Sequence, residues 1–155
     1  MQTTEIDLVI FDCDGVLIDS EIISSKILIS QLADAGVSVD FEYFQRWFLG
    51  RSFPKVTESV RQTFDVVLPA DFEASYRRRL LQAFRTELKA TVGVAEIVDN
   101  LSRPTCVATS STPERLRRSL ELTGLAHYFG KDVFTASEVK SGKPALDLFF
   151  IQPTK

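Results

Sequence analysis

The feature that most constrains this chain is a short apolar run, Leu8–Phe11, which ends in two aspartates one residue apart. A continuous apolar run of this length is typical of a strand buried on both faces, as in a parallel sheet. Asp12 and Asp14 then place like charges where the strand leaves the core, and these repel unless a cation or a shared proton offsets them. This arrangement predicts a divalent-metal site with an acidic nucleophile beside it. The alternative interpretation is a strand followed by a simple turn at Asp14-Gly15.

The first strand is predicted over residues 6–11, and helices are predicted to follow it with no second strand between them. Apolar residues recur at helical spacing over residues 20–35, 40–48, 54–63 and 69–88. After this block the pattern changes, and helices alternate with short apolar strands. The predicted elements are a helix at 93–101, a strand at 105–109, a helix from Pro113 to the residue before Gly124, a strand at 132–136, and a helix after Lys143-Pro144.

This order of elements predicts an α/β fold with a helical insertion. Strand and helix alternate before and after the helical block, as in an α/β core with a parallel sheet. The insertion begins at the carboxyl end of the first strand, where open α/β sheets bind ligands, so we expect it to act as a lid. The predicted organisation is therefore a discontinuous core, 1–16 and 89–155, and a helical cap, 17–88.

The bulk properties exclude several classes of protein. The 155 residues are 45% apolar and 25% charged, which is ordinary for one globular domain with a modest insertion. The net charge of −3 lacks the basic surplus of nucleic-acid-binding proteins, so we expect no nucleic-acid partner. No apolar run approaches the ~18 residues of a membrane span, and the N-terminus lacks the regions of a signal peptide. We therefore expect no membrane partner and a cytoplasmic location.

Several residues that can carry chemistry are interpreted as structural. Cys13 and Cys106 are too few for a disulfide framework, and both are expected in the core as small apolar residues. His127 follows a predicted helix and is expected to have a structural role. The basic run 77–79 is interpreted as the solvated face of a helix.

Two further segments place polar side chains after predicted strands. Thr109 ends the second strand and precedes Ser110 and a helix start, where a hydroxyl group and free backbone N–H groups suit a phosphate oxygen. Lys143 follows the third strand, and its ammonium group is able to offset the negative charge of Asp12 and a phosphate. A Ser/Thr-rich helix cap and a surface lysine are the alternative interpretations.

The string from Asp12 to Glu21, D-C-D-G-V-L-I-D-S-E, resembles the first motif of the haloacid dehalogenase superfamily of phosphatases. The resemblance runs from about Ile6 to Phe149. It is closest to the branch that contains β-phosphoglucomutase and small sugar-phosphate phosphatases, including 6-phosphogluconate phosphatases. It implies a Rossmann-like core with a parallel sheet and an inserted helical cap.

The resemblance also implies roles for the candidate residues. Asp12 matches the nucleophile, and Asp14 matches the general acid and base. Thr109 and Lys143 match the hydroxyl and lysine residues of the second and third motifs. The family cofactor is Mg²⁺, which the Asp12 carboxylate and the Asp14 main-chain carbonyl are expected to hold. The residues expected to contact substrate are Gly15, Ser110 and, in the cap, Arg51. A plain surface charge is the alternative interpretation of Arg51.

One motif of the family has no counterpart in this sequence. Beyond the lysine, the family carries an acidic pair that supplies a further carboxylate to the metal, whereas this sequence ends at Lys155. We therefore expect a C-terminally truncated member with a weakened Mg²⁺ site and an incomplete sheet. Residues 8–11 are then expected to form an exposed apolar edge, which favours self-association.

The function expected from this reasoning is Mg²⁺-dependent hydrolysis of a small phosphorylated metabolite, most readily a sugar phosphate, through an aspartyl-phosphate on Asp12. Two alternatives remain open. One is a catalytically impaired remnant that acts only in binding or assembly, because the fourth motif is missing. The other is a phosphosugar mutase of the β-phosphoglucomutase type.

Overall fold

The computed structural model describes residues 6–150, and the chain divides into two compact units. Unit 1 contains the residues up to Ser20 and those from Glu87 onward, and unit 2 is Glu21–Thr86. Segment 17–20, which the sequence analysis assigned to the insertion, therefore lies in unit 1. There the Asp19 N–H donates to the Lys89 carbonyl at 3.0 Å, which ties this segment to the chain that returns from the helices.

Unit 1 is built on a parallel sheet in the order β1-β2-β3. The strands are β1 (Val9–Phe11), β2 (Thr105–Thr109) and β3 (Val133–Thr135). Ile10 pairs with Cys106, and Ala108 pairs with Phe134. The predicted α/β class with a parallel sheet is confirmed. The predicted bounds of β2 hold, whereas β1 and β3 are shorter than the predicted strands at 6–11 and 132–136.

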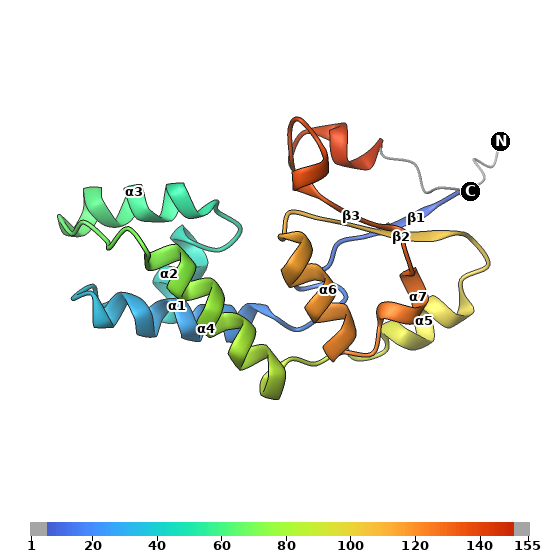
Figure 1. Cartoon of the computed structure of the whole chain (residues 1–155), viewed down its shortest axis with the longest axis horizontal. Helices are drawn as coiled ribbons and strands as arrows, with labels where there is room; N and C mark the ends of the chain where they lie inside the picture. Colours follow the sequence, from blue (N-terminus) through green and yellow to red (C-terminus); the bar gives the residue numbers. More distant parts are fainter. Residues whose placement is uncertain (1–5, 151–155) are drawn as a thin grey trace. The chain divides into compact units, whose positions relative to one another are not determined.

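Helices cover one side of this sheet. They are α5 (Val94–Asn100), α6 (Pro113–Leu122) and α7 (Ala126–Phe129). Figure 1 shows these helices on one side of the sheet and the segment that follows β3 on the other side. That segment contains the 3-10 helices η1 (Ala136–Glu138) and η2 (Leu146–Phe149). The helix predicted after Lys143-Pro144 is therefore only the single short turn η2.

Each face of the sheet has its own apolar contacts, because side chains alternate along a strand. On one face, a buried cluster joins β2, β3 and η2; its members are Cys106, Ala108, Phe134 and Leu148. On the other face, the ring of Phe11 meets the ring of Phe129 edge to face, with centroids 5.9 Å apart. The segment after β3 is thus packed onto the sheet through Leu148.

Helix α6 begins and ends where its sequence predicts. The Thr112 hydroxyl caps the helix by accepting from the Arg115 N–H at 3.4 Å, and Pro113 occupies the first helical position. After the helix, Gly124 adopts φ of 72°, and the Leu125 N–H donates to the Leu120 carbonyl at 2.9 Å. This is the Schellman ending, for which the left-handed conformation of glycine is suited.

Unit 2 consists of helices α1 (Glu21–Asp34), α2 (Phe41–Trp47), α3 (Phe53–Phe64) and α4 (Phe72–Glu87). Their buried faces form one apolar cluster, whose members are Leu28, Leu32, Val37, Phe44, Phe48, Val56, Val60 and Phe72. A buried hydrogen bond of 2.8 Å from Gln31 Nε2 to the Phe72 carbonyl joins α1 to the start of α4. Residues 77–79 are exposed, as predicted, with ion pairs to Glu73 and Asp34. Within residues 6–150, no helix combines the length and apolar character needed to cross a membrane.

We predict that the apolar face of α6 stabilises unit 1. Leu116 is 2% exposed and Leu122 is 41% exposed in the same helix. Leu116→Ala should lower the free energy of unfolding by about 2–5 kcal/mol, because it leaves a cavity in the core. Leu122→Ala is the matched control and should cost about 1 kcal/mol or less. Urea unfolding measures both, and equal losses would contradict this assignment of the buried face.

Candidate active site

The candidate residues of unit 1 lie after the carboxyl ends of strands. Asp12 follows β1 directly, and Thr109 is the last residue of β2. Because β1 and β2 are parallel, with Phe11 paired to Val107, both strands end at the same edge of the sheet. This edge is where open α/β sheets bind ligands.

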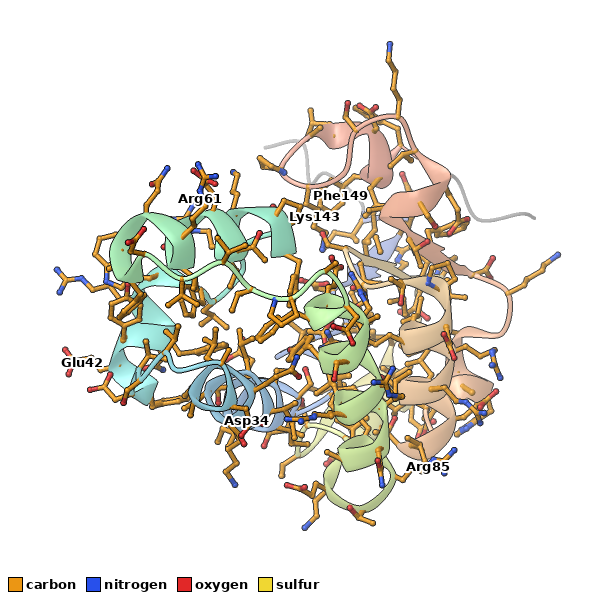
Figure 2. The ribbon with its side chains drawn as sticks, turned by 60° about the vertical axis from the view of Figure 1, so that its left-hand side comes forward. Asp34, Glu42, Arg61, Arg85, Lys143 and Phe149 are labelled. Carbon is orange, nitrogen blue, oxygen red and sulfur yellow. The ribbon has the colours of Figure 1, made fainter. Side chains whose placement is uncertain are left out.

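The side chain of Asp12 is paired with Lys143. Lys143 Nζ lies 3.0 Å from Asp12 Oδ1, and the side chains are 22% and 44% exposed, respectively. The Cys13 N–H also donates to Asp12 Oδ1, at 2.8 Å. The ring of Phe149 lies beneath the lysine, with Nζ 5.5 Å from the ring centroid, and Figure 2 shows these two side chains next to each other. Among residues 6–150 no donor reaches Asp12 Oδ2, so this oxygen is open to a ligand.

The side chain of Asp14 accepts three hydrogen bonds. Ser20 Oγ donates to Oδ1 at 2.7 Å, and Arg115 Nη2 donates to the same oxygen at 2.6 Å. Ser111 Oγ donates to Oδ2 at 2.5 Å. The Asp14 and Arg115 side chains are 28% and 20% exposed, so this ion pair is partly shielded from solvent.

A tight loop positions these two aspartates. The Cys13 carbonyl accepts from the N–H groups of Val16, Leu17 and Ile18, at 2.9–3.3 Å. Gly15 adopts φ of 72°, and its own N–H donates to the Ile18 carbonyl at 2.9 Å. The predicted substrate contact at Gly15 therefore does not use this N–H, which the loop already occupies. Left-handed glycine allows the chain to turn immediately after Asp14.

The second candidate segment is joined to Asp14. Thr109 is buried, at 1% exposure, and its hydroxyl accepts from the Ser111 N–H at 3.2 Å. Ser111 in turn donates to Asp14, so the end of β2 and the loop after β1 are linked. Ser110 lies between them and is exposed.

Sequence reasoning identified some of these residues and missed others. Asp12 and Lys143 are brought together, and Asp14 is joined to Thr109 through Ser111. Arg51 lies in unit 2, in the exposed turn between α2 and α3. The residues that were missed are the donors to Asp14, namely Ser20, Ser111 and Arg115.

The site contains a few oxygen atoms that are able to bind a hard cation. Asp12 Oδ2 is open, and no backbone N–H within residues 6–150 donates to the Asp14 main-chain carbonyl. Both atoms fit Mg²⁺, which prefers oxygen ligands and keeps several waters or phosphate oxygens in its shell. Over the same residues, no group of three or more His, Cys, Asp or Glu side chains is placed to hold a metal. Asp12 and Asp14 thus remain the predicted protein ligands of this site, with no further side-chain ligand beside them among residues 6–150.

The two cysteines are buried, as predicted, at 1% exposure each. Burial raises the pKa of the Cys13 thiol to about 12, and the nearby Asp14 charge adds to this effect. Burial also raises the pKa of Cys106, with a contribution from Asp132. His127 is exposed and contacts the ring of Tyr128, with centroids 3.9 Å apart.

Comparison with known proteins places the chain among hydrolases. Residues 6–150 match the haloacid dehalogenase-like hydrolase family. The 6-phosphogluconate phosphatase of Escherichia coli is 28% identical over 148 residues, which cover 95% of this chain and 67% of that enzyme. The chain thus spans about two thirds of the length of this relative.

Two solved structures share the fold. A haloacid dehalogenase-like protein of unknown function from Agrobacterium tumefaciens is 30% identical, with a TM-score of 0.84. The match covers 94% of this chain and 66% of that protein. A family hydrolase from Deinococcus radiodurans, solved with bound phosphate and sodium, is 33% identical with a TM-score of 0.72. This match covers 92% of this chain and 64% of that hydrolase.

We predict that neither thiol reacts readily in the native protein. At pH 8 the raised pKa values keep both groups protonated, and burial blocks the reagent, so a disulfide reagent should modify almost no thiol. After denaturation both cysteines should react. Ser102→Cys, at an exposed position, is the control and should add one fast-reacting thiol. Fast modification of Cys13 in the native wild type would contradict its placement.

Proposed function

The chain belongs to the haloacid dehalogenase-like hydrolase family, as its first motif predicted, and we propose that it hydrolyses the phosphate ester of a small phosphorylated metabolite. The observation that carries this proposal is the pairing of Asp12 with Lys143 at the end of β1. Phosphoryl transfer requires a nucleophile and positive charge near the phosphoryl oxygens. A carboxylate with one open oxygen can act as the nucleophile, and the cation beside it supplies the positive charge.

In the proposed first step the Asp12 carboxylate attacks phosphorus. A new bond forms between a carboxylate oxygen and phosphorus, and the bond from phosphorus to the ester oxygen breaks, which leaves an aspartyl-phosphate. The Asp14 carboxyl group gives its proton to the departing oxygen, so that an alcohol leaves in place of an alkoxide.

In the second step Asp14 acts as a general base instead of a general acid. The Asp14 carboxylate takes a proton from a water molecule, whose oxygen attacks phosphorus and displaces the Asp12 carboxylate. Inorganic phosphate is released, and both aspartates return to their starting states. Lys143 contacts Asp12, and its charge favours each crowded anionic state along this path.

The phosphate contacts of the proposal come from the end of β2 and from the lysine. Thr109 and Ser110 supply a hydroxyl group and a backbone N–H ahead of helix α6, and Lys143 supplies an ammonium group. Gly15 and Arg51 remain proposed substrate contacts. Mg²⁺, held by the Asp12 carboxylate and the Asp14 carbonyl, would add positive charge at the phosphoryl oxygens.

The relatives support a sugar phosphate as the substrate class. The curated relative from Escherichia coli acts as a 6-phosphogluconate phosphatase, and the Deinococcus radiodurans hydrolase binds phosphate. Both match this chain over more than nine tenths of its length. Phosphorylated metabolites are charged and are retained inside cells, so the proposal includes a cytoplasmic location.

Two other functions would use the same residues differently. A module that binds phosphate without turnover is favoured because, among residues 6–150, no group of three or more His, Cys, Asp or Glu side chains is placed to hold a metal. A phosphosugar mutase would return the phosphoryl group to the sugar instead of to water. Product analysis separates these functions from the phosphatase.

We predict that Asp12→Asn lowers phosphate release by at least about 1000-fold, because it removes the nucleophile. The assay measures inorganic phosphate from 6-phosphogluconate and other sugar phosphates in the presence of Mg²⁺. Asp7→Asn, at an exposed position before β1, is the control and should retain activity. Chelation with EDTA should stop the wild type, and added Mg²⁺ should restore it.

Other outcomes reject either the proposed mechanism or the phosphatase itself. Unchanged phosphate release by Asp12→Asn removes the proposed mechanism. An isomerised sugar phosphate without free phosphate selects the mutase. Saturable phosphate binding with no turnover of any donor selects the binding module.

We also propose that β1 supports self-association. Within the described sheet β1 has a neighbour on one side only, and the side chains of residues 8–11 are only partly buried. The Val9 N–H donates to the Pro104 carbonyl, and alternate residues of a parallel strand bond the same neighbour. The Ile10 N–H therefore faces the free edge, which is able to pair with a second copy.

Sedimentation velocity tests this pairing. The wild type should sediment faster as its concentration rises, whereas Ile10→Pro should remain monomeric. Proline removes the donor on the free edge and is tolerated on edge strands. Circular dichroism checks that the variant folds. A wild type that stays monomeric at all concentrations would reject the proposal.

A further inference from the structure

The carboxyl group of Asp14 is held by residues from three separate places in unit 1. Ser20 lies just before α1, Ser111 lies in the loop after β2, and Arg115 lies in the first turn of α6. All three donate to Asp14, at 2.5–2.7 Å. The orientation of this carboxyl group is therefore set by contacts on both of its oxygens.

The donors on the two oxygens differ in chemistry. A serine hydroxyl group can donate or accept, so Ser111 is able to accept a hydrogen bond from Oδ2 when that oxygen carries a proton. A guanidinium group only donates, so Arg115 cannot accept a hydrogen bond from Oδ1. Oδ1 also accepts from the Ser20 hydroxyl group, so it has two donors, one of them charged, against the single serine on Oδ2. Oδ2 is therefore the oxygen that is better placed to exchange a proton.

We propose that Arg115 is a positioning residue, which holds Oδ1 of Asp14 so that Oδ2 delivers the proton to the leaving oxygen. This inference rests on the proposed function, because it describes how Asp14 is oriented when it protonates the leaving oxygen in the first step of the proposed hydrolysis. Arg115 does not contact the reacting atoms in this scheme and acts only through Asp14.

Helix α6 fixes the place of Arg115. The Arg115 N–H donates to the Thr112 hydroxyl, and the next residue, Leu116, is buried in the core. The backbone at Arg115 is therefore anchored on both sides. Its exposed neighbours Arg117 and Arg118 both pair with Glu121 on the same helix, so they do not compete for Asp14.

The test compares how the Arg115 substitution affects cleavage of two phosphate esters that differ in their leaving groups. An alkoxide is a poor leaving group and needs a proton, whereas p-nitrophenolate is a stable anion and leaves without one. In Arg115→Gln, the first-turnover cleavage of 6-phosphogluconate should fall by about 10- to 100-fold. The first-turnover release of p-nitrophenolate from p-nitrophenyl phosphate should change by less than about threefold, because that step needs no acid.

The matched control is Arg117→Gln, which removes a guanidinium group from an exposed ion pair on the same helix. It should leave both rates unchanged. Equal losses for both donors in Arg115→Gln, or no loss for either, would overturn the assignment. If Arg115→Gln does not fold, Arg115→Lys is measured in the same way, and a selective loss with 6-phosphogluconate is again expected.

Failure of the proposed function has a different signature. If the wild type cleaves neither donor, the phosphatase is rejected, and crystal structures of the wild type and Arg115→Gln then decide the positioning claim. The Asp14 carboxyl group should rotate away from Ser111 in the variant. An unchanged Asp14–Ser111 hydrogen bond would overturn the role of Arg115.

Discussion

The structure of this site depends on how two neighbouring carboxylates are kept together at the end of one strand. Asp12 and Asp14 each have their own cation: Lys143 lies 3.0 Å from the first, and Arg115 lies 2.6 Å from the second. Two like charges this close in sequence would otherwise repel and turn apart. The separate partners also make the two aspartates different, since Asp12 keeps one open oxygen and Asp14 has hydrogen bonds on both.

The parallel sheet is what brings these cations to the aspartates. The chain returns to the same edge at the end of β2, and again after β3, so residues far apart in sequence meet there. Arg115 is supplied by the helix after β2, and Lys143 by the segment after β3. Leu148 packs that last segment onto the sheet, and the ring of Phe149 lies under the lysine ammonium group.

Local signals in the sequence were sufficient to predict the elements whose ends are marked by capping or helix-breaking residues or by a clear apolar run. The bounds of β2 and the start and end of α6 follow from an apolar run, a threonine cap, a proline and a glycine, each of which acts within a few residues. The extent of β1 did not follow, because pairing with β2 begins only at Val9. The turn at η2 was predicted as a helix because its apolar pattern does not reveal its length.

The candidate site was predictable only in part, because local sequence signals do not show which distant residues meet in the fold. Asp12 and Asp14 are adjacent in a rare string, and Lys143 stands in a recognisable Lys-Pro motif. Arg115 is 101 positions from Asp14, and nothing in its neighbourhood distinguishes it from Arg117. Only the register of the sheet and the position of α6 reveal its partner.

The most direct measurement of the central claim is to trap the phosphorylated protein. The full chain is mixed with a cleavable phosphate ester and Mg²⁺, quenched in acid within the first turnover, digested and analysed by mass spectrometry. We predict a phosphoryl group on Asp12, formed and lost at rates compatible with turnover. Phosphate release with no phosphorylated residue, or with the label on a residue other than Asp12, would contradict it.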